Sequence, residues 1–292
     1  MKILLTADWH LRGDAPVCRV EPLEWLDDQR KSVEQLYPVA AGCDEVWILG
    51  DLFHRCRTST EATVQALSLL SGFDCPVYVL PGNHDLLQHA YGNLDKSTIG
   101  AVYSLRNVHE LSCRNEPSVQ AYAFGTEPDT IPHCDIWCTH QLVFPDNDAR
   151  PLPDIGVIAE DLLARSDARL ILTGDYHHGY IKEFGDTRVV TCGCLDIQAS
   201  DMADYAPRCY ILDTDGMSVS EVPLKKFGKV HADPKREARQ ELETYMEGLV
   251  DFDVPHLDFI ANVESAVRKE TDADVRASVQ EVLTEYDPSK AI

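Results

Sequence analysis

Positive charge is scarce in this sequence. Lysine and arginine together number 26 against 49 aspartates and glutamates, so the formal net charge is −23. Proteins that grip duplex nucleic acid usually present a basic face, because neutralising phosphates supplies most of the affinity. The composition therefore argues against a broad basic binding face. Two possibilities remain. Either the substrate is not a polyanion, or a polyanion is bound locally, through metals or together with a partner.

Long apolar runs are also missing. No segment approaches the roughly 18–20 apolar residues that a membrane span needs, and the apolar part of "MKILLTADWH" is too short for a secretory signal. We therefore expect no membrane segment and a cytoplasmic location. In that setting the ten scattered cysteines should be reduced and packed as small apolar side chains, without a disulfide framework. Cys192 and Cys194 form a C-x-C pair, which is a weak metal signal.

Two common catalytic patterns are absent as well. We find neither a serine-centred nucleophile elbow nor a glycine-rich phosphate loop. A covalent serine intermediate is therefore not expected.

Short apolar runs alternate with helical patterns from the start of the chain. The runs are 2–7, 44–50, 75–82, 134–140 and 169–174, and the helical patterns are 25–41 and 59–72. Apolar strands of this continuity favour an α/β sheet that is covered on both faces. Further strands are predicted at 187–193, 206–216 and 217–227. The last two are joined by a turn at "DTDG" and form either a second sheet or a hairpin that finishes the first. The pattern becomes helical after residue 229, which predicts domains at 1–228 and 229–292.

Each of five apolar runs is followed by side chains that bind protons or metals. Because the carboxyl ends of strands line the site in open α/β sheets, residues far apart in sequence can converge there. Any one of these short motifs alone would be an ordinary loop, but five in order at strand ends indicate a site. Mixed imidazole and oxygen ligands suit Mn, Fe or Zn better than Ca, and two cations can clamp both oxygens of a phosphoryl displacement. The residues are Asp8, His10, Asp51, His54, Asn83, His84, His140, Asp175 and His177.

The motifs "DWH", "GDLFH", "GNHD", the isolated "TH" and "GDYH" resemble the five motifs of calcineurin-like metallophosphoesterases, over about residues 1–225. Within that superfamily "GDLFHRCRTS" is most similar to DNA-repair exonuclease subunits of the SbcD kind, mainly through His54 with Arg55 and Arg57 nearby. The resemblance implies a calcineurin-like four-layer α/β/β/α sandwich with a dinuclear metal site at the strand carboxyl ends, plus a short helical C-terminal region.

Site roles follow from the resemblance. Two divalent ions are implied, with Mn expected and Mg, Fe or Zn left open. His84 would face the phosphate and stabilise the developing charge, Asp85 would orient His84, and His54 would lie near the scissile phosphate. Asp51 would bridge the two metals. The remaining ligands would be Asp8, His10 and His177 for the first metal, and Asn83, His140 and Asp175 for the second.

One motif departs from the family pattern. The family usually has G-H-x-H where this chain has Gly174-Asp175-Tyr176-His177. We hypothesise that Asp175 makes the second metal a weaker Lewis acid and shifts preference toward harder ions such as Mn or Mg. The alternatives are that Asp175 points away, or that His178 supplies a ligand.

The leading functional hypothesis is a Mn-dependent DNA nuclease that uses a metal-activated hydroxide. It would be the nuclease subunit of a complex with an SMC-like coiled-coil ATPase in DNA repair or recombination. The helices after residue 229 would dock this partner or pack back on the catalytic domain, and a homodimer is left open. The alternatives are a phosphodiesterase or phosphatase acting on nucleotides or other small phosphoesters, and a catalytically weak scaffold.

Overall fold

The computed structural model describes residues 1–115, 118–152 and 154–230. Its backbone divides into two units, of which the first holds residues 1–15, 20–197 and 204–229. The described part of the second unit contains the 3-10 helix η5 (Ser200–Met202) and a bridge between Arg19 and Val230. The helical region expected at 229–292 lies almost wholly outside the described residues, so the predicted boundary stays a prediction.

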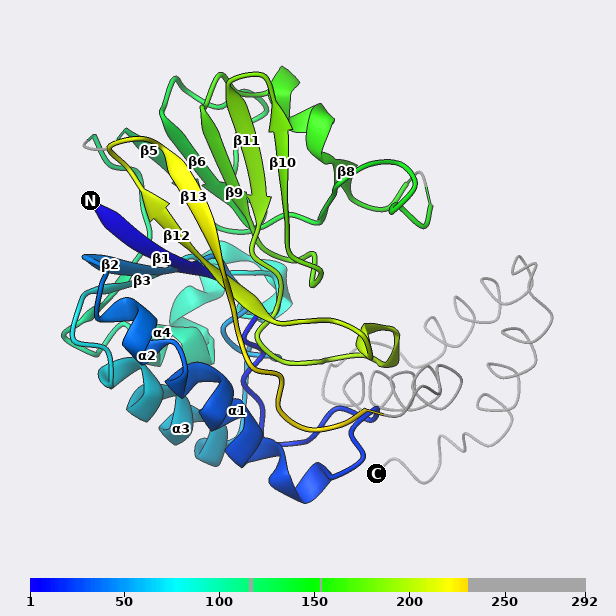
Figure 1. Ribbon diagram of the computed structural model, residues 1–292. Helices are drawn as coiled ribbons and strands as arrows, with labels where there is room; N and C mark the ends of the chain where they lie inside the picture. The colour runs from blue at the N-terminus through cyan, green and yellow to red at the C-terminus, as the bar shows by residue number, and fades with distance from the viewer. Residues whose placement is uncertain (116–117, 153, 231–292) are drawn as a thin grey trace, which may run out of the picture. The chain divides into compact units, whose positions relative to one another are not determined.

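The first unit contains a six-stranded sheet that starts at the N-terminus. Its strand order is β13-β12-β1-β2-β3-β4, and the strands β1 to β4 run parallel to one another. The hairpin β12–β13 adds to β1 in antiparallel fashion, so the two late strands finish the first sheet (Figure 1). The bounds are β1 Lys2–Thr6, β2 Glu45–Ile48, β3 Val77–Val79, β4 Val108–Glu110, β12 Arg208–Asp213 and β13 Ser218–Pro223.

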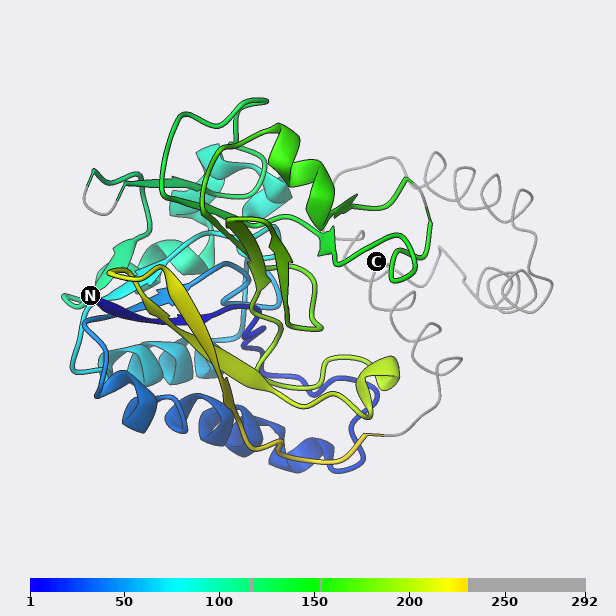
Figure 2. The ribbon, with the colours of Figure 1, turned by 45° about the horizontal axis from the view of Figure 1, so that its top comes forward.

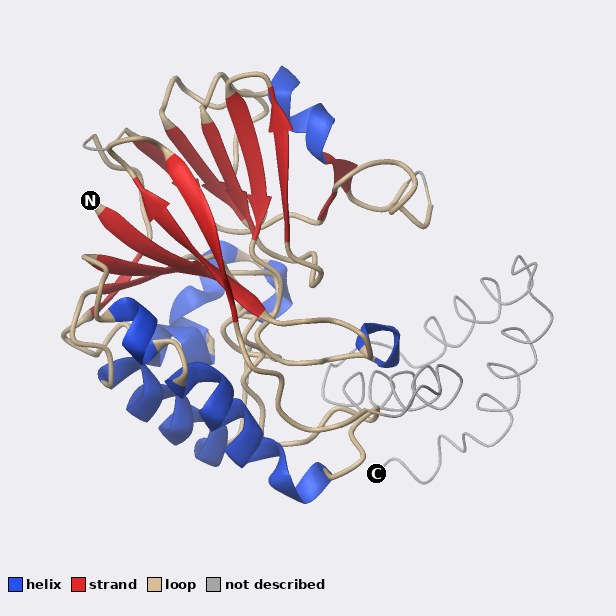
Figure 3. Cartoon of the chain, in the orientation of Figure 1, coloured by secondary structure: helices blue, strands red, loops and turns tan. Residues whose placement is uncertain are grey.

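A five-stranded sheet follows in the order β10-β11-β9-β6-β5. Its strands β5, β6, β9 and β11 are parallel, and β10 closes one edge in antiparallel fashion. Figure 3 shows the two sheets facing each other. The bounds are β5 Val119–Tyr122, β6 Ile136–Thr139, β9 Leu170–Thr173, β10 Tyr180–Phe184 and β11 Thr187–Thr191, with a small pair formed by β7 Val143–Phe144 and β8 Val157–Ile158.

The predicted helices form, with one break. The pattern 25–41 becomes two helices, α1 (Trp25–Glu34) and α2 (Tyr37–Ala40), and Pro38 lies in the first turn of α2, where a missing N–H is tolerated. Helix α3 (Thr60–Ser71) begins as predicted, because Ser59 accepts a hydrogen bond from the backbone N–H of Ala62. The other helical segments are η1 Pro22–Glu24, η2 Leu87–His89, η3 Tyr91–Lys96, α4 Thr98–Val102 and η4 Ala159–Ala164.

Alternating side chains of the strands fill three separate apolar layers. Leu4 of β1 points into the layer under the helices, whereas Ile3 and Leu5 point into the layer between the two sheets. On the second sheet, Cys138 faces the inner layer and Trp137 packs in the outer one beside η4. The inner strands such as β1 and β6 are therefore apolar on both faces, and the four-layer α/β/β/α sandwich is confirmed (Figure 2). The second helical layer is reduced to the short 3-10 helix η4.

Within the described ranges, the structure contains no helix that combines the length and apolar character needed to cross a membrane.

Candidate metal centre

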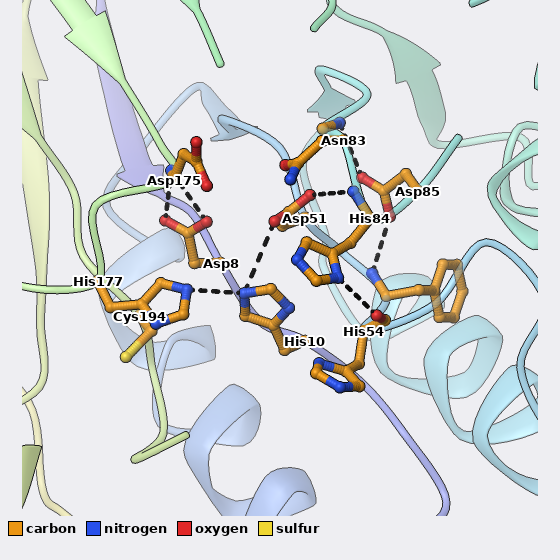
Figure 4. A network of polar contacts seen from close by, with 12 residues as sticks. Asp8, His10, Asp51, His54, Asn83, His84, Asp85, Asp175, His177 and Cys194 are labelled. Carbon is orange, nitrogen blue, oxygen red and sulfur yellow. Dashed lines mark hydrogen bonds and ion pairs between the residues drawn. The ribbon is translucent and has the colours of Figure 1, made fainter. Parts of the chain in front are cut away.

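The loops that follow β1 and β2 run side by side and carry the first group of polar residues. Backbone N–H groups of Asp8 and His10 donate to the carbonyl oxygens of Gly50 and Asp51, each at 3.0 Å. Asp8, His10 and Asp51 have φ values of 51°, 45° and 50°. Such left-handed backbone is uncommon for residues other than glycine and concentrates at functional sites. The paired loops thus hold these three side chains toward one another (Figure 4).

One set of candidate ligands combines the β1 loop with the loop after β9. Donor atoms of Asp8, His10 and His177 all lie within 4.8 Å of one another. The Nε2 atoms of His10 and His177 are 2.9 Å apart, a distance that requires a proton or a cation between them. Burial lowers the pKa of His10 well below its ordinary value and lowers that of His177 to about 4. Both rings are therefore neutral near pH 7, with lone pairs available to a metal.

A second set lies where the loops after β2, β3 and β6 meet. His140 places its Nδ1 2.7 Å from the Leu49 carbonyl oxygen, so Nδ1 carries a hydrogen and Nε2 is left to face a proton or a cation at the centre. That Nε2 is 3.0 Å from Oδ1 of Asn83 and 3.4 Å from Oδ1 of Asp51. Three lone-pair atoms that converge in this way favour a cation between them. Rotating the Asn83 amide would instead direct its NH₂ group at Asp51 and His140.

Buried negative charge at the centre also favours cations. Burial, followed by the nearby Asp51 and Asp175, raises the pKa of Asp8 well above its usual range. Although burial favours the neutral form of His140, the adjacent Asp51 raises the pKa of this imidazole. The electrostatic field therefore draws positive charge to this point. The buried mixed set of carboxylate, amide and imidazole donors fits two divalent cations.

Asp175 lies beside the centre without joining either compact set. Its backbone N–H donates to both carboxylate oxygens of Asp8 at 3.1 Å. Burial raises the pKa of Asp175, and the charges of the nearby His140 and Asp51 also act on it. Its oxygens are not among the donor groups within 4.8 Å of one another in the described residues. Ligation by Asp175 therefore stays a prediction. The neighbouring His178 contacts the Tyr205 ring at a centroid distance of 5.6 Å and belongs to none of these donor groups.

His84 and His54 form a stacked pair at the edge of the centre. Their ring centroids are 5.4 Å apart with an interplanar angle of 25°, and ring nitrogens of both lie within 4.8 Å of a ring nitrogen of His10. The Nδ1 atom of His84 lies 2.8 Å from the His54 carbonyl oxygen, so Nδ1 carries the hydrogen and Nε2 is left for substrate. Burial, with smaller contributions from Arg12 and other neighbours, lowers the pKa of His54 to about 2. His54 is thus a neutral imidazole near pH 7.

The expected orientation of His84 by Asp85 needs correction. The Asp85 carboxylate accepts hydrogen bonds from the backbone N–H groups of Phe53, Gly82 and Leu52 at 2.8, 3.0 and 3.2 Å. The His54 carbonyl, rather than Asp85, holds the His84 ring. Asp85 therefore ties the loop after β2 to the loop after β3. The physical reason is that its buried oxygens are already occupied by backbone donors.

Three glycines were overlooked in the sequence as parts of the site. A Cβ atom on Gly50 would lie 2.0 Å from Nδ1 of His140, one on Gly174 would lie 2.6 Å from the same atom, and one on Gly82 would lie 2.1 Å from Oδ1 of Asp51. The His140 ring therefore fits only because all three loops present glycine there. A sequence signal existed, since glycine directly precedes the ligand-type residue in "GD", "GNHD" and "GDYH".

The chain is similar in sequence to a curated hydrolase over part of its length. UDP-2,3-diacylglucosamine hydrolase from Xanthomonas campestris pv. campestris strain B100 is 26% identical over 150 residues, which are 49% of this chain and 51% of that protein. The same enzyme from strain 8004 matches to the same extent. The chain thus spans about half the length of the curated relatives it matches.

Among solved structures, a novel archaeal phosphodiesterase is 13% identical, with 77% of this chain and 100% of that chain covered at a TM-score of 0.42. Zinc-complexed Vps29 from Entamoeba histolytica is 15% identical, with 77% and 98% covered at a TM-score of 0.33. The family model described as calcineurin-like phosphoesterase matches residues 1–194. This range contains every candidate ligand and all strands of both sheets apart from the β12–β13 hairpin. The chain belongs to the calcineurin-like phosphoesterase family.

Proposed function

We propose that this metal-dependent phosphoesterase is a nuclease that hydrolyses phosphodiester bonds of DNA with manganese as the preferred metal. The observation that carries the proposal is the stacking of His54 on His84 at the edge of the metal centre. A diester has a second esterified oxygen that a monoester lacks. Two imidazoles beside the cation ligands can contact the phosphate and the leaving oxygen together.

The chain's own residues have separable tasks in this reaction. The donor sets around Asp51 would hold two divalent cations, which would supply the Lewis acidity and the activated water that phosphoester hydrolysis needs near neutral pH. His84 presents Nε2 toward the phosphate, because its Nδ1 is held by the His54 carbonyl, and it stabilises developing charge or protonates the leaving oxygen. His54 remains neutral and positions the diester. Asp85 holds the loop after β2 against the loop after β3 by accepting three backbone hydrogen bonds.

The test compares three classes of substrate on one protein. The full-length chain with Mn²⁺ is assayed on labelled single- and double-stranded DNA, on bis(p-nitrophenyl) phosphate and on a nucleoside diphosphate sugar. We expect DNA cleavage that EDTA abolishes, and a loss of about 100-fold in kcat for His84→Ala, as for removal of one group that stabilises transition-state charge.

The second imidazole is tested by His54→Ala. We expect this variant to lower the kcat/KM ratio of DNA to bis(p-nitrophenyl) phosphate. The matched control His133→Ala removes an exposed histidine that pairs with Asp167 and should leave the ratio unchanged. Efficient hydrolysis of the nucleoside diphosphate sugar without any DNA cleavage would reject the nuclease proposal.

That outcome would instead favour the second candidate, a hydrolase of nucleotides or other small phosphoesters. Two observations support this candidate, namely the net charge of −23, which repels polyanions, and the likeness to an enzyme named for a UDP-sugar substrate. The intact donor sets speak against the third hypothesis, a catalytically weak scaffold.

As a nuclease, the chain is further proposed to act with an SMC-like coiled-coil ATPase. The segment proposed to dock this partner, 229–292, lies outside the described residues apart from 229 and 230. Co-expression with a candidate ATPase, followed by size-exclusion chromatography of the full chain and of a chain ending at residue 228, tests the proposal. The same chromatography reports whether the chain alone is a homodimer.

A further inference from the structure

We propose that a pocket beside the metal centre binds a second phosphate group of the substrate, next to the phosphate that is hydrolysed. The inference rests on the proposed phosphodiester chemistry and names what that site recognises beyond the scissile bond. Arg12, Arg55 and Arg57 are the residues that would make the contact.

The pocket is a continuation of the two loops that carry the metal ligands. After Asp8 and His10, the first loop goes on to Arg12, and after Asp51 and His54 the second goes on to Arg55. The pairing persists along the way, because Leu11 donates its backbone N–H to the Leu52 carbonyl at 2.9 Å and accepts from the backbone N–H of His54 at 3.2 Å. A group bound beside Arg12 and Arg55 therefore lies next to the metal centre, on the far side of His54.

The pocket has a volume of about 400 Å³, and the first loop lies close to the start of α3 there. A Cβ on Gly13 would lie 2.6 Å from Oγ of Ser59, so glycine at this position permits the close approach without moving the Ser59 side chain. The lining residues are Arg12, Gly13, Asp14, Arg55, Arg57, Thr58, Ser59 and Glu61.

The charge of the pocket is opposite to that of the whole chain. Three arginines face two acidic residues, Asp14 and Glu61, in a chain where acidic residues outnumber basic ones by 49 to 26. Arg12 is neutralised by an ion pair with Asp14. Arg55 and Arg57, in contrast, form no ion pair within the described residues, and both are exposed to solvent. Their guanidinium groups are free to bind an anion.

The chemistry of the pocket points to phosphate. Guanidinium groups present several N–H donors in a planar fork that matches phosphate oxygens. The pocket also lies at the N-terminus of the 12-residue helix α3, whose dipole adds partial positive charge there. We expect a single-phosphate ester to contact the metal centre alone, and a substrate with two neighbouring phosphates to reach the pocket as well. The second phosphate comes from the adjacent diester of a DNA strand, or from the diphosphate of a nucleotide ester.

The decisive experiment uses a double variant and a matched control. Arg55→Gln/Arg57→Gln removes the two unpaired charges, and Arg106→Gln removes an exposed arginine that also lacks an ion pair in the described residues. Oligothymidylate of about ten residues, a nucleoside diphosphate sugar and bis(p-nitrophenyl) phosphate are compared with Mn²⁺. We expect kcat/KM for oligothymidylate, divided by kcat/KM for bis(p-nitrophenyl) phosphate, to fall about tenfold in the double variant. This is the scale of one or two lost charged hydrogen bonds. The loss should appear mainly in KM, and the control should keep the wild-type ratio.

A binding measurement separates this proposal from the nuclease proposal. Fluorescence anisotropy of labelled oligothymidylate with the full chain in EDTA should show a Kd at least about tenfold weaker for the double variant than for the control. If the wild type binds in this way but does not cleave DNA, the pocket stands and the nuclease function falls. If kcat/KM relative to bis(p-nitrophenyl) phosphate falls for the nucleoside diphosphate sugar but not for oligothymidylate, the second phosphate is that of a nucleotide. Equal binding and equal ratios in all three proteins, or equal losses on all substrates, would overturn the pocket.

Discussion

The backbone N–H of His84 donates a hydrogen bond to Oδ1 of Asp51 at 3.0 Å. This contact joins the loop after β3 to the carboxylate that lies between the two donor sets. Oδ2 of Asp51 is 3.7 Å from Nε2 of His10, and Oδ1 is 3.4 Å from Nε2 of His140. Asp51 is thus oriented by the chain itself, with one oxygen toward each set, and its role as a bridging ligand stays a prediction.

Asp51→Asn keeps the shape of this side chain and removes its charge. We expect weaker binding of at least one cation, because a neutral amide no longer offsets the repulsion of two divalent ions. Activity on bis(p-nitrophenyl) phosphate should fall about 100-fold or more. Calorimetric titration of the apo-protein with Mn²⁺ measures the binding, and two unchanged sites would contradict the bridging role.

Asp85→Asn removes the acceptor that ties two loops together. Burial and the nearby Asp51 raise the pKa of Asp85 to about 7, so the variant mimics a form that is already accessible near neutral pH. We expect a loss of about 10–100-fold in kcat, as for other residues that support metal ligands, and a lower melting temperature. The control is Asp129→Asn, an exposed aspartate. A wild-type pH profile together with wild-type activity in Asp85→Asn would contradict the role.

Gly82→Ala should disrupt the candidate metal centre through a steric clash. The added methyl group would lie 2.1 Å from Oδ1 of Asp51 and 2.8 Å from Nε2 of His140, and such overpacking costs about 1–3 kcal/mol. We expect reduced stability and weaker Mn²⁺ binding, measured by thermal unfolding with and without metal. Gly92→Ala is the matched control, since nothing lies within 4 Å of its added Cβ.

Asp175→His restores the histidine that the family usually carries. If Asp175 ligates the second metal, the variant should bind Zn²⁺ more tightly relative to Mn²⁺, because imidazole is a softer ligand than carboxylate. Competition titrations of apo-protein measure the ratio directly. An unchanged Zn/Mn preference would refute the hypothesis that Asp175 sets the choice of metal.

The ten free cysteines should differ sharply in reactivity. Cys113 is exposed, whereas Cys138, Cys192, Cys194 and Cys209 are buried, and burial raises the pKa of Cys209 to about 12. Because the thiolate is the reactive form, a thiol reagent at pH 8 should modify Cys113 first and these four only after unfolding. Mass spectrometry of the partly labelled protein identifies the sites, and early labelling of Cys192 would contradict the packing described here.

Local patterns in the sequence predicted the neighbourhood of the site and many of the elements, but not the strands β4, β5, β7, β8 and β10. The run "KILLTA" is apolar without alternation, which predicts a strand buried on both faces, and Leu4 and Leu5 of β1 do enter two different apolar layers. The Ser59 cap and the ligand-type residues at five strand ends were equally readable, since helix capping and strand termination are decided by adjacent residues. The break between α1 and α2 was missed, although Pro38 offered a local signal.

Contacts across the molecule were decided only by the tertiary structure. Asp8 and His177 are 169 positions apart in sequence, and no local rule states that their donor atoms meet. The family resemblance implied that Asp85 orients the His84 ring. In the structure, the His54 carbonyl contacts that ring, and Asp85 accepts hydrogen bonds from three backbone N–H groups. The reason is physical: residue types and spacing determine which side chains reach a strand end, but the packing of two sheets determines which donor faces which acceptor.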